Sequence, residues 1–297
     1  MKIGILGNIV KPNIADVAGI LFSCLRNHKL SFVIHDLLAQ SLKNSSIGSV
    51  ITDEMIVTER DLPAKCDMLI ALGGDGTMLA AARIVGEHQI PILGVNLGKL
   101  GFLAEVSVEE MCACIDNIVR GDFRIEDRMV LTATTSNDDK VFYALNEIVV
   151  DRGSSARVIE LETFVNDEFL VTYAADGILV TTPTGSTAYS LASGGPIVTP
   201  GSAVITVNPI SPHTLTARPV IVADTGIVRV SVRSKASLVH ITADGQIEAG
   251  YVPPVEFTIR KAPFVVKLVK RKNNSYFGLL RAKLFWGRDP RLENQKK

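Results

Sequence analysis

Long apolar runs, an excess of charge of one sign and cysteine-rich patterns are all missing from this chain of 297 residues. No apolar run reaches the roughly 18 residues that would suggest a membrane span. Lys and Arg total 31, and Asp and Glu also total 31, so the formal net charge is zero. A neutral chain argues against a dominant electrostatic attraction to nucleic acid or to a membrane. We therefore expect neither nucleic acid nor a membrane as a partner.

Cysteine is scarce, with four residues at Cys24, Cys66, Cys112 and Cys114. Cys112 and Cys114 lack the two-residue spacer of a redox or zinc motif, and no His follows them at ligand spacing. We interpret all four as free thiols of a cytoplasmic protein and expect no protein-built metal site. The N-terminal MKIGILGNIV also lacks a signal-peptide pattern and is interpreted as a first strand.

Strand and helix patterns alternate over residues 1–125. The expected strands are KIGILGN, SFVIHDL, CDMLIALGG and IPILGVNLG, and the expected helices are ADVAGILFSCLRNHKL, TMLAAARIVGEHQ and SVEEMCACIDNIVRGD. For the last helix we expect Ser107 as the N-cap, with Glu110 three residues on and Gly121 past the end. Such alternation predicts a Rossmann-like α/β domain with a mostly parallel sheet.

Period-two patterns replace this alternation over residues 126–272. In GIVRVSVR, for example, Val228, Val230 and Val232 share one face. Many such strands with Gly, Pro and Asp turns argue for an antiparallel sandwich or barrel, and we predict an all-β sandwich domain. Residues 273–297 contain a C-terminal helix pattern that runs through Leu284 and stops near Gly287 and Pro290. We expect this helix to pack back on the first domain.

A glycine turn follows the apolar run LIAL. Gly73, Gly74 and Gly76 remove the side chains that would keep a ligand off the backbone, and Asp75 and Thr77 complete the turn. The Lys of a Walker A loop is missing, and the pattern is not G-x-G-x-x-G. One interpretation is a phosphate-binding turn in which backbone N–H groups and a divalent cation neutralise charge. The other is a tight turn whose Asp caps the next helix.

Three later stretches combine polar groups with apolar strands. Asn146 and Glu147 interrupt FYALNEIVV and point to opposite faces, so at least one should be buried and need a partner. A structural hydrogen-bonded pair is the simpler interpretation. The stretch ADGILVTTPTGSTAYS offers hydroxyls, glycines and one aromatic ring, which suits a nucleoside, although a Ser/Thr-rich turn with a capped helix also fits. Ser186 lies in no G-x-S-x-G elbow. Asp244-Gly245-Gln246 alone predicts a hairpin turn.

Taken together and in this order, these stretches closely resemble the NAD kinase family over residues 1 to about 290. The segments GVNLGKLGFLAEV and NPISPHTLTARPVIV add to the resemblance. It implies transfer of the γ-phosphoryl group of ATP to the 2′-hydroxyl of the adenosine ribose of NAD, with Mg²⁺ arriving on ATP. The resemblance leaves open whether inorganic polyphosphate can replace ATP as the donor. The resemblance also implies a homo-oligomer, either a dimer or a tetramer.

The resemblance assigns roles to individual residues. Asp75 becomes the proton acceptor, and the phosphate loop is Gly73, Gly74, Gly76 and Thr77. The implied NAD-binding residues are Asp75, Gly76, Asn146, Glu147, Arg157, Ala174, Asp176, Thr187, Ala188, Tyr189, Ser190, Leu191, Ala192 and Gln246.

Ala174 departs from the family pattern, because many bacterial members have Arg or Lys two residues before the motif Asp. This leaves one charge contact to be supplied elsewhere. Two rival functions are a lipid kinase of the diacylglycerol type and a non-catalytic NAD(P) sensor. A lipid kinase does not predict TPTGSTAYS, and a sensor would not need Asp75.

Overall fold

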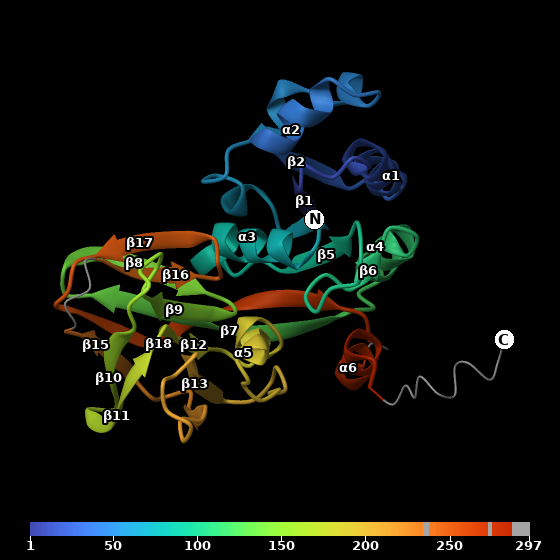
Figure 1. The fold of residues 1–297 in the computed structure, drawn as a ribbon. Coiled ribbons are helices and arrows are strands. Elements are labelled where there is room, and N and C mark those ends of the chain that lie inside the picture. Colours follow the sequence, from blue (N-terminus) through green and yellow to red (C-terminus); the bar gives the residue numbers. More distant parts are fainter. Residues whose placement is uncertain (234–237, 273–274, 287–297) are drawn as a thin grey trace. The chain divides into compact units, whose positions relative to one another are not determined.

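A computed structural model of the chain describes residues 1–233, 238–272 and 275–286 (Figure 1). The chain forms two compact units. The first comprises Met1–Ile84, Ile90–Glu126 and the described residues from Leu268 onward, and the second comprises Val85–Gln89 and Asp127–Lys267. The expected helix stop at Gly287 and Pro290 lies outside the described residues.

The first unit is built on a parallel sheet with strand order β3-β2-β1-β4-β5. This is the order of a doubly wound fold, in which the chain changes direction beside the first strand. At the outer edge, β5 also pairs with β6 and with Leu268 near the end of β18. The strands are β1 (Lys2–Gly7), β2 (Ser31–His35), β3 (Ile56–Val57), β4 (Met68–Gly73), β5 (Ile92–Asn96) and β6 (Val106–Ser107).

Helices bury their apolar residues against this sheet, and the predicted Rossmann-like α/β domain is confirmed. In α1, Val17, Leu21 and Leu25 are buried in the core together with Ile5 of β1. The helices are α1 (Ile14–Asn27), α2 (Asp36–Lys43), α3 (Asp75–Val85), α4 (Met111–Val119) and α6 (Tyr276–Leu284). The last of these falls in the first unit, as expected for the C-terminal helix.

The sequence expectation missed the helix α2 and placed the start of α4 too early. The expected strand SFVIHDL ends at His35, and α2 begins at once with Asp36. The reciprocal bonds expected of Ser107 and Glu110 are present, with each backbone N–H donating to the other side chain at 3.2 and 3.4 Å. The helix nevertheless begins at Met111, so this pair closes the turn before α4.

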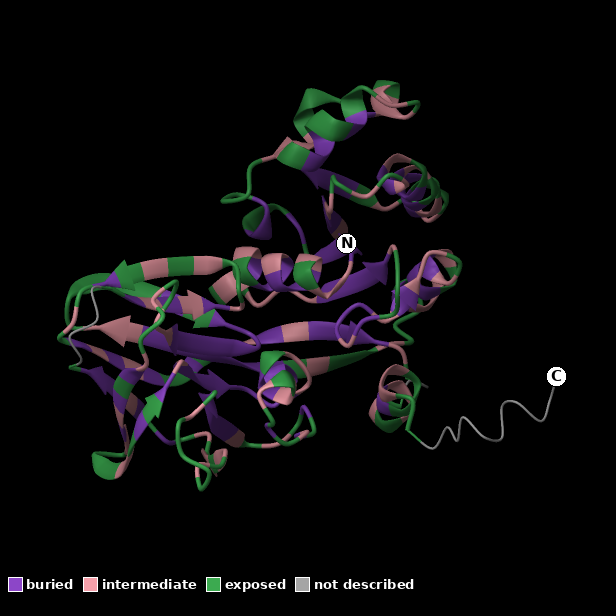
Figure 2. Cartoon of the chain, in the orientation of Figure 1, coloured by how far each residue is buried: buried purple, intermediate pink, exposed green. Residues whose placement is uncertain are grey.

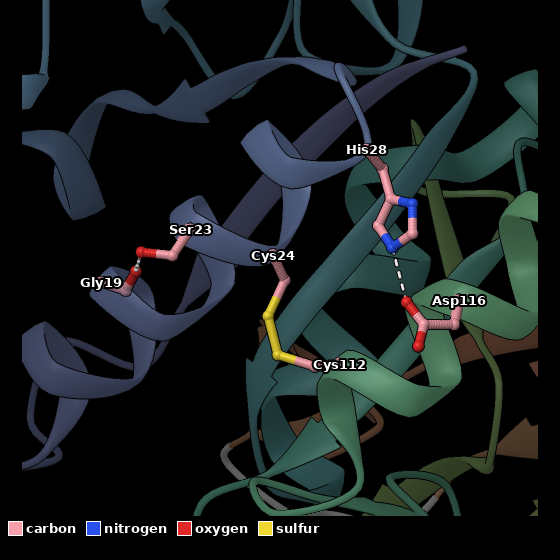
Figure 3. Close-up of a disulfide and its surroundings, with 6 residues drawn as sticks. All are labelled: Gly19, Ser23, Cys24, His28, Cys112 and Asp116. Atoms are coloured by element: carbon pink, nitrogen blue, oxygen red, sulfur yellow. Dashed lines mark hydrogen bonds and ion pairs between the residues drawn. A yellow bond between two sulfur atoms is a disulfide. The ribbon is translucent and has the colours of Figure 1, made fainter.

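The prediction of four free thiols is wrong for two of them. Cys24 of α1 and Cys112 of α4 form a disulfide with their Cα atoms 5.8 Å apart (Figure 3). One helical turn further on, His28 Nε2 and Asp116 Oδ1 are hydrogen-bonded at 2.5 Å between the same two helices (Figure 3). The spacing rules failed here because the partners are 88 residues apart in sequence and meet only when α1 packs on α4. Cys66 and Cys114 are free and buried.

The second unit is an antiparallel sandwich, as predicted. One sheet has the order β14-β13-β12-β9-β16-β17, and the other contains β11-β10-β15-β18, with β7 and β8 continuing from β18. The strands are β7 (Arg124–Thr135), β8 (Asp138–Ala144), β9 (Glu147–Asp151), β10 (Ile159–Val165), β11 (Glu168–Ala175), β12 (Gly177–Thr181), β13 (Val204–Ile210), β14 (Val220–Ala223), β15 (Val228–Val232), β16 (Val239–Ala243), β17 (Ile247–Tyr251) and β18 (Val255–Lys270). The short helix α5 spans Tyr189–Ala192.

Inward-facing residues of both sheets form a single apolar core. Val228, Val230 and Val232 of β15 are fully buried, and they pack with Ile148 and Val150 of β9, a strand that is buried over most of its length (Figure 2). Full burial of one such side chain is worth roughly 1.5–3 kcal/mol. Within the described residues, no helix has the length and apolarity that crossing a membrane requires.

Candidate functional site

The glycine turn joins β4 to α3 in the first unit. A Cβ added to Gly73 would lie 2.6 Å from the Cβ of Thr77, so only glycine fits there. A Cβ added to Gly74 or Gly76 would meet nothing within 4 Å, so the backbone faces open space at both positions. The helix begins at Asp75 and has 11 residues. Helix N–H groups beside open backbone suit an anionic ligand, because the N-terminal end of a helix dipole attracts negative charge.

The carboxylate of Asp75 is held by backbone donors from another loop. The N–H of Phe102 donates to Oδ2 at 2.8 Å, and the N–H groups of Leu103 and Ala104 donate to Oδ1 at 2.9 and 3.1 Å. This loop follows β5, and the parallel pairing of β4 with β5 brings it beside the glycine turn. Asp75 is therefore fixed by a neighbouring segment, which the simple capping interpretation did not include.

In the second unit, Asn146 and Glu147 lie where β8 gives way to β9. The N–H of Leu145 donates to Oδ2 of Asp244 at 2.8 Å, and the N–H groups of Asn146 and Glu147 donate to Oδ1 at 2.7 and 3.2 Å. The apolar stretch FYALNEIVV is thus two strands with a break, because these N–H groups bond to a carboxylate. Asp244 itself lies in the β16–β17 hairpin, as predicted, with φ of +53° followed by +64° at Gly245.

Two buried threonines hold the backbone of the same segment from the other side. Thr181 Oγ1 donates to the carbonyl oxygen of Asn146 at 2.9 Å, and Thr182 Oγ1 donates to that of Leu145 at 2.6 Å. The N–H of Gly185 donates in turn to Thr182 Oγ1 at 3.1 Å. A Cβ at Gly185 would lie 2.6 Å from the carbonyl carbon of Asn146, so the glycine allows this close packing.

Glu147 is a buried carboxyl group with an unsatisfied oxygen. The residue is 7% exposed, and its Oε2 has no hydrogen-bond partner within the described residues. Burial, and secondarily the charge of Asp244, raise the pKa of Glu147 to about 8. The expectation that the Asn-Glu pair would place a polar group in need of a partner is met by this oxygen.

Both serines of the TPTGSTAYSL stretch make hydrogen bonds within the second unit. Ser186 is fully buried, and its hydroxyl donates to the Pro183 carbonyl oxygen at 2.7 Å and accepts from the Val198 N–H at 3.0 Å. Ser190 is also fully buried, and Asn208 Nδ2 donates to its carbonyl oxygen at 3.2 Å. Ser190 therefore turns its side chain inward.

Tyr189 stands out from this packed turn, with 44% of its surface exposed. Partial burial raises the pKa of its phenol, and the charges of Asp151, Asp176 and Glu147 raise it further. The ring thus lies within electrostatic reach of three carboxyl groups. An exposed aromatic face of this kind can stack on a flat ligand.

Asp176 forms an ion pair that sequence reasoning did not foresee. Arg152 Nε donates to its Oδ1 at 2.6 Å. Ala174, two residues before Asp176, is exposed, and its carbonyl oxygen accepts from the His213 N–H at 2.8 Å. Arg157 is exposed as well, and its N–H donates to the Ser155 hydroxyl at 3.2 Å.

The predicted contact residues of the second unit fall at two ends of one strand pair. Glu147 opens β9 opposite Thr181, which closes β12. Asp151 closes β9 opposite Gly177, the residue after Asp176. Four strand steps of roughly 3.4 Å separate the ends, or about 14 Å. The remaining predicted residues are partly or fully exposed at Thr187, Ala188, Leu191, Ala192 and Gln246.

The sequence does not reveal the groups that hold Asp75 and the 145–147 segment in place. The donors at 102–104 are backbone N–H groups, for which residue type gives no signal. Asp244 was visible as part of a turn, and its positive φ agrees with that, but its three acceptor bonds depend on a neighbour 97 to 99 positions away. Arg152 could have been found as a cation near the motif Asp.

Comparisons with known proteins cover nearly the whole chain. Residues 3–123 match the family model described as the ATP-NAD kinase N-terminal domain, and residues 145–271 match that of the ATP-NAD kinase C-terminal domain. An NAD kinase of Geobacter metallireducens is 38% identical over 289 residues, which are 96% of this chain and 99% of that protein. An NAD kinase of Bacteroides fragilis is 40% identical over 296 residues, 98% of this chain and 100% of that protein.

Solved structures agree with these matches. The crystal structure of yeast NADH kinase complexed with NADH has a TM-score of 0.87 at 26% identity and covers 97% of this chain and 89% of that one. An NAD kinase from Archaeoglobus fulgidus in complex with ATP has a TM-score of 0.75 at 24% identity, covering 96% of this chain and 98% of that one, and therefore shares the fold.

Proposed function

The chain belongs to the NAD kinase family, and on that premise we propose that it transfers the γ-phosphoryl group of ATP to the 2′-hydroxyl of the adenosine ribose of NAD, giving NADP. It is accordingly an enzyme, a phosphotransferase. The relatives favour neither a lipid kinase nor a non-catalytic sensor. The observation on which the proposed chemistry depends is the glycine turn, with Asp75 fixed beside backbone that faces open space.

We propose Asp75 as the proton acceptor. Phosphoryl transfer passes through a loose transition state, so the protein mainly positions groups and neutralises charge. A ribose hydroxyl is far too weakly acidic to be ionised in advance at neutral pH. The carboxylate would therefore orient the hydroxyl and accept its proton late in the transfer. The open space on the Cβ side of Gly74 and Gly76 supports close approach of the ribose and the phosphates.

We propose that NAD contacts the second unit at the two ends of the β9–β12 pair. A dinucleotide is long enough to span the roughly 14 Å between the two ends of this pair. The adenosine would lie near Asn146 and Glu147, where an unsatisfied buried oxygen awaits a hydrogen-bonding partner. The other half would reach toward Asp176, with Tyr189 offering its exposed face between them. Arg152, paired with Asp176, is a candidate for the cation that Ala174 does not supply.

The residues present fit a Mg²⁺ ion that arrives bound to ATP. Within the described residues, no group of three or more His, Cys, Asp or Glu side chains could hold a metal by itself. Mg²⁺ needs few protein ligands, because it usually keeps several waters and binds largely through substrate phosphates. When bound, the ion would neutralise phosphate charge. The family resemblance further leads us to propose a cytoplasmic homo-oligomer.

The test is NADP formation by the purified chain from NAD and Mg-ATP, read with an NADP-specific dehydrogenase. Parallel reactions would replace NAD by NADH or by a diacylglycerol, and ATP by polyphosphate. NADH belongs in the set because a structural neighbour is an NADH kinase complexed with NADH. NADP formation that disappears in Asp75→Asn supports the proposed reaction and acceptor together. No NADP from a folded chain that still binds NAD would overturn the proposal.

A further inference from the structure

The loop after β5 holds Asp75 through its backbone alone. In the part of the chain that the structure describes, the three donors to the carboxylate are the N–H groups of Phe102, Leu103 and Ala104. The loop is closed by a bond from the Gly101 N–H to the Ala104 carbonyl oxygen at 3.3 Å. A carboxylate that accepts from several main-chain donors on one segment cannot rotate without breaking all of them.

Asn96, the last residue of β5, braces this loop from inside. It is 6% exposed, and its Nδ2 donates to the carbonyl oxygens of Lys99 at 2.7 Å and Ala104 at 3.3 Å. Its Oδ1 accepts from the Gly98 N–H at 2.7 Å. A buried side chain with these bonds fixes both limbs of the loop. The donors to Asp75 are therefore in place before any substrate binds.

Gly101 is the position that makes the arrangement sterically possible. A Cβ built on Gly101 would lie 2.6 Å from Cγ of Asp75 and closer still to its Oδ1. Real Cβ atoms essentially never approach other heavy atoms this closely. The backbone of Gly101 does not have a positive φ, so the glycine is needed for space. Any larger residue would push the carboxylate away from the three donors.

The two carboxylate oxygens of Asp75 are left unequal by this loop. A carboxylate offers about four lone-pair sites, two on each oxygen. Among the described residues, Oδ1 already accepts two N–H groups, whereas Oδ2 accepts only that of Phe102. We propose that the Gly101–Ala104 loop positions Asp75 so that the second site of Oδ2 receives the ribose hydroxyl proton, and that Gly101 is a positioning residue for the reaction. This inference rests on the proposed function.

Gly101→Ala tests the inference through kcat and KM. We expect kcat for NADP formation to fall at least 100-fold, while KM for NAD and for ATP changes less than about threefold, because misorientation acts on the transition state. The matched control is Gly98→Ala in the same loop. A Cβ there would meet nothing closer than Lys11 Nζ at 3.6 Å, an ordinary contact, so we expect wild-type kcat.

A double-mutant cycle separates positioning from general damage. If Gly101 acts only through the carboxylate, adding Gly101→Ala to Asp75→Asn should cause no further loss of kcat. A further tenfold loss would overturn the inference. So would a fully active Gly101→Ala in an otherwise active enzyme, and that result would leave the proposed function standing. A wild-type chain that makes no NADP would remove the proposed function and this inference with it.

If Gly101→Ala folds poorly, melting temperatures of combined variants test the inference instead. The clash is with Asp75, so the combination with Asp75→Ala removes the atoms that a new Cβ would meet. The double variant should then melt within a few degrees of Asp75→Ala alone. A double variant that stays as unstable as Gly101→Ala would show that position 101 packs against something else, which contradicts the inference.

Discussion

Asp75 in the first unit and Glu147 in the second are both carboxyl groups at predicted substrate positions, but their hydrogen bonding is opposite. Asp75 accepts three backbone N–H groups from one braced loop. Glu147 is buried with an oxygen that has no partner in the described part of the chain. The first arrangement fixes the orientation of the Asp75 carboxylate. The second leaves a buried oxygen of Glu147 in need of a hydrogen-bond partner.

The difference indicates different tasks in the proposed reaction. A group that accepts a proton in the transition state must be oriented before the substrate arrives, which backbone donors achieve at little entropic cost. A group that recognises a substrate can remain unsatisfied until the ligand supplies the missing bond. Burial raises the pKa of Glu147 to about 8, so at neutral pH its side chain is mainly a neutral carboxylic acid with an O–H to donate.

The largest expected effect is that of Asp75→Asn. The amide retains size and can still accept from part of the loop, but it cannot accept a proton. We expect kcat for NADP formation to fall by about 10³, near the middle of the range for general acid–base catalysis, with KM for NAD altered only a few fold. Steady-state kinetics would measure both. An equally active variant would contradict the assignment of Asp75 as the proton acceptor. The proposed difference in task between Asp75 and Glu147 would then be wrong as well.

The disulfide offers a way to change the first unit without touching Asp75. Replacing both Cys24 and Cys112 by Ser should lower the free energy of unfolding by about 3 kcal/mol, because the bond closes a long loop in the unfolded chain. The kcat of NADP formation should stay within twofold, since neither α1 nor α4 contributes a predicted site residue.

Denaturant unfolding with and without dithiothreitol would measure this effect. Wild-type protein in the reductant should match the double variant, and the variant itself should not respond. Equal stability of the two proteins without reductant would contradict the expectation. A large loss of kcat would show that stability and chemistry in this unit are coupled.

Sequence patterns predicted the elements better than the contacts between them. Period-two alternation at Val228, Val230 and Val232 was enough for the sandwich, because burial of one strand face is a local property. Asp75 was found for the same reason, because the pattern of glycines around it is contained in five consecutive residues, 73–77. The disulfide and the bonds of Asp244 were not, because they join residues about 90 to 100 positions apart whose meeting depends on how whole elements pack.

A smaller effect, on stability, is expected for Glu147→Gln. The folded-state pKa of about 8 lies above the ordinary value of 4.5. Between these two pH values the folded state holds a proton that the unfolded state has lost, so the stability of the wild-type chain falls as pH rises and levels off above pH 8. The upper limit is roughly 5 kcal/mol at 1.36 kcal/mol per pKa unit, and we expect about 2 kcal/mol.

Glutamine removes this dependence because it does not titrate. Unfolding measured at pH 5 and pH 9 should show the variant gaining about 2 kcal/mol relative to wild type at the higher pH. Glu160→Gln, at an exposed position on β10, is the matched control and should leave the pH dependence unchanged. If the stability of the wild-type chain does not fall between these pH values, Glu147 has a hydrogen-bond partner. Its side chain would then be satisfied, like that of Asp75.

The smallest effect we expect is for Asp244→Asn, which loosens the segment beneath Glu147 without touching substrate. Asn tolerates the positive φ of this position, and its oxygen can still accept from Asn146 and Glu147, but its amide nitrogen would face the Leu145 N–H. KM for NAD should rise about tenfold, or roughly 1.4 kcal/mol, with kcat within threefold.

Because the charge of Asp244 raises the pKa of Glu147, the same variant should also move the stability transition of Glu147 to lower pH. Asp138→Asn, whose carboxylate accepts from the Tyr251 hydroxyl at 2.7 Å on another strand, should do neither. A change in KM without the shift in pH dependence would separate the positioning of the backbone from the electrostatic coupling of the two acids.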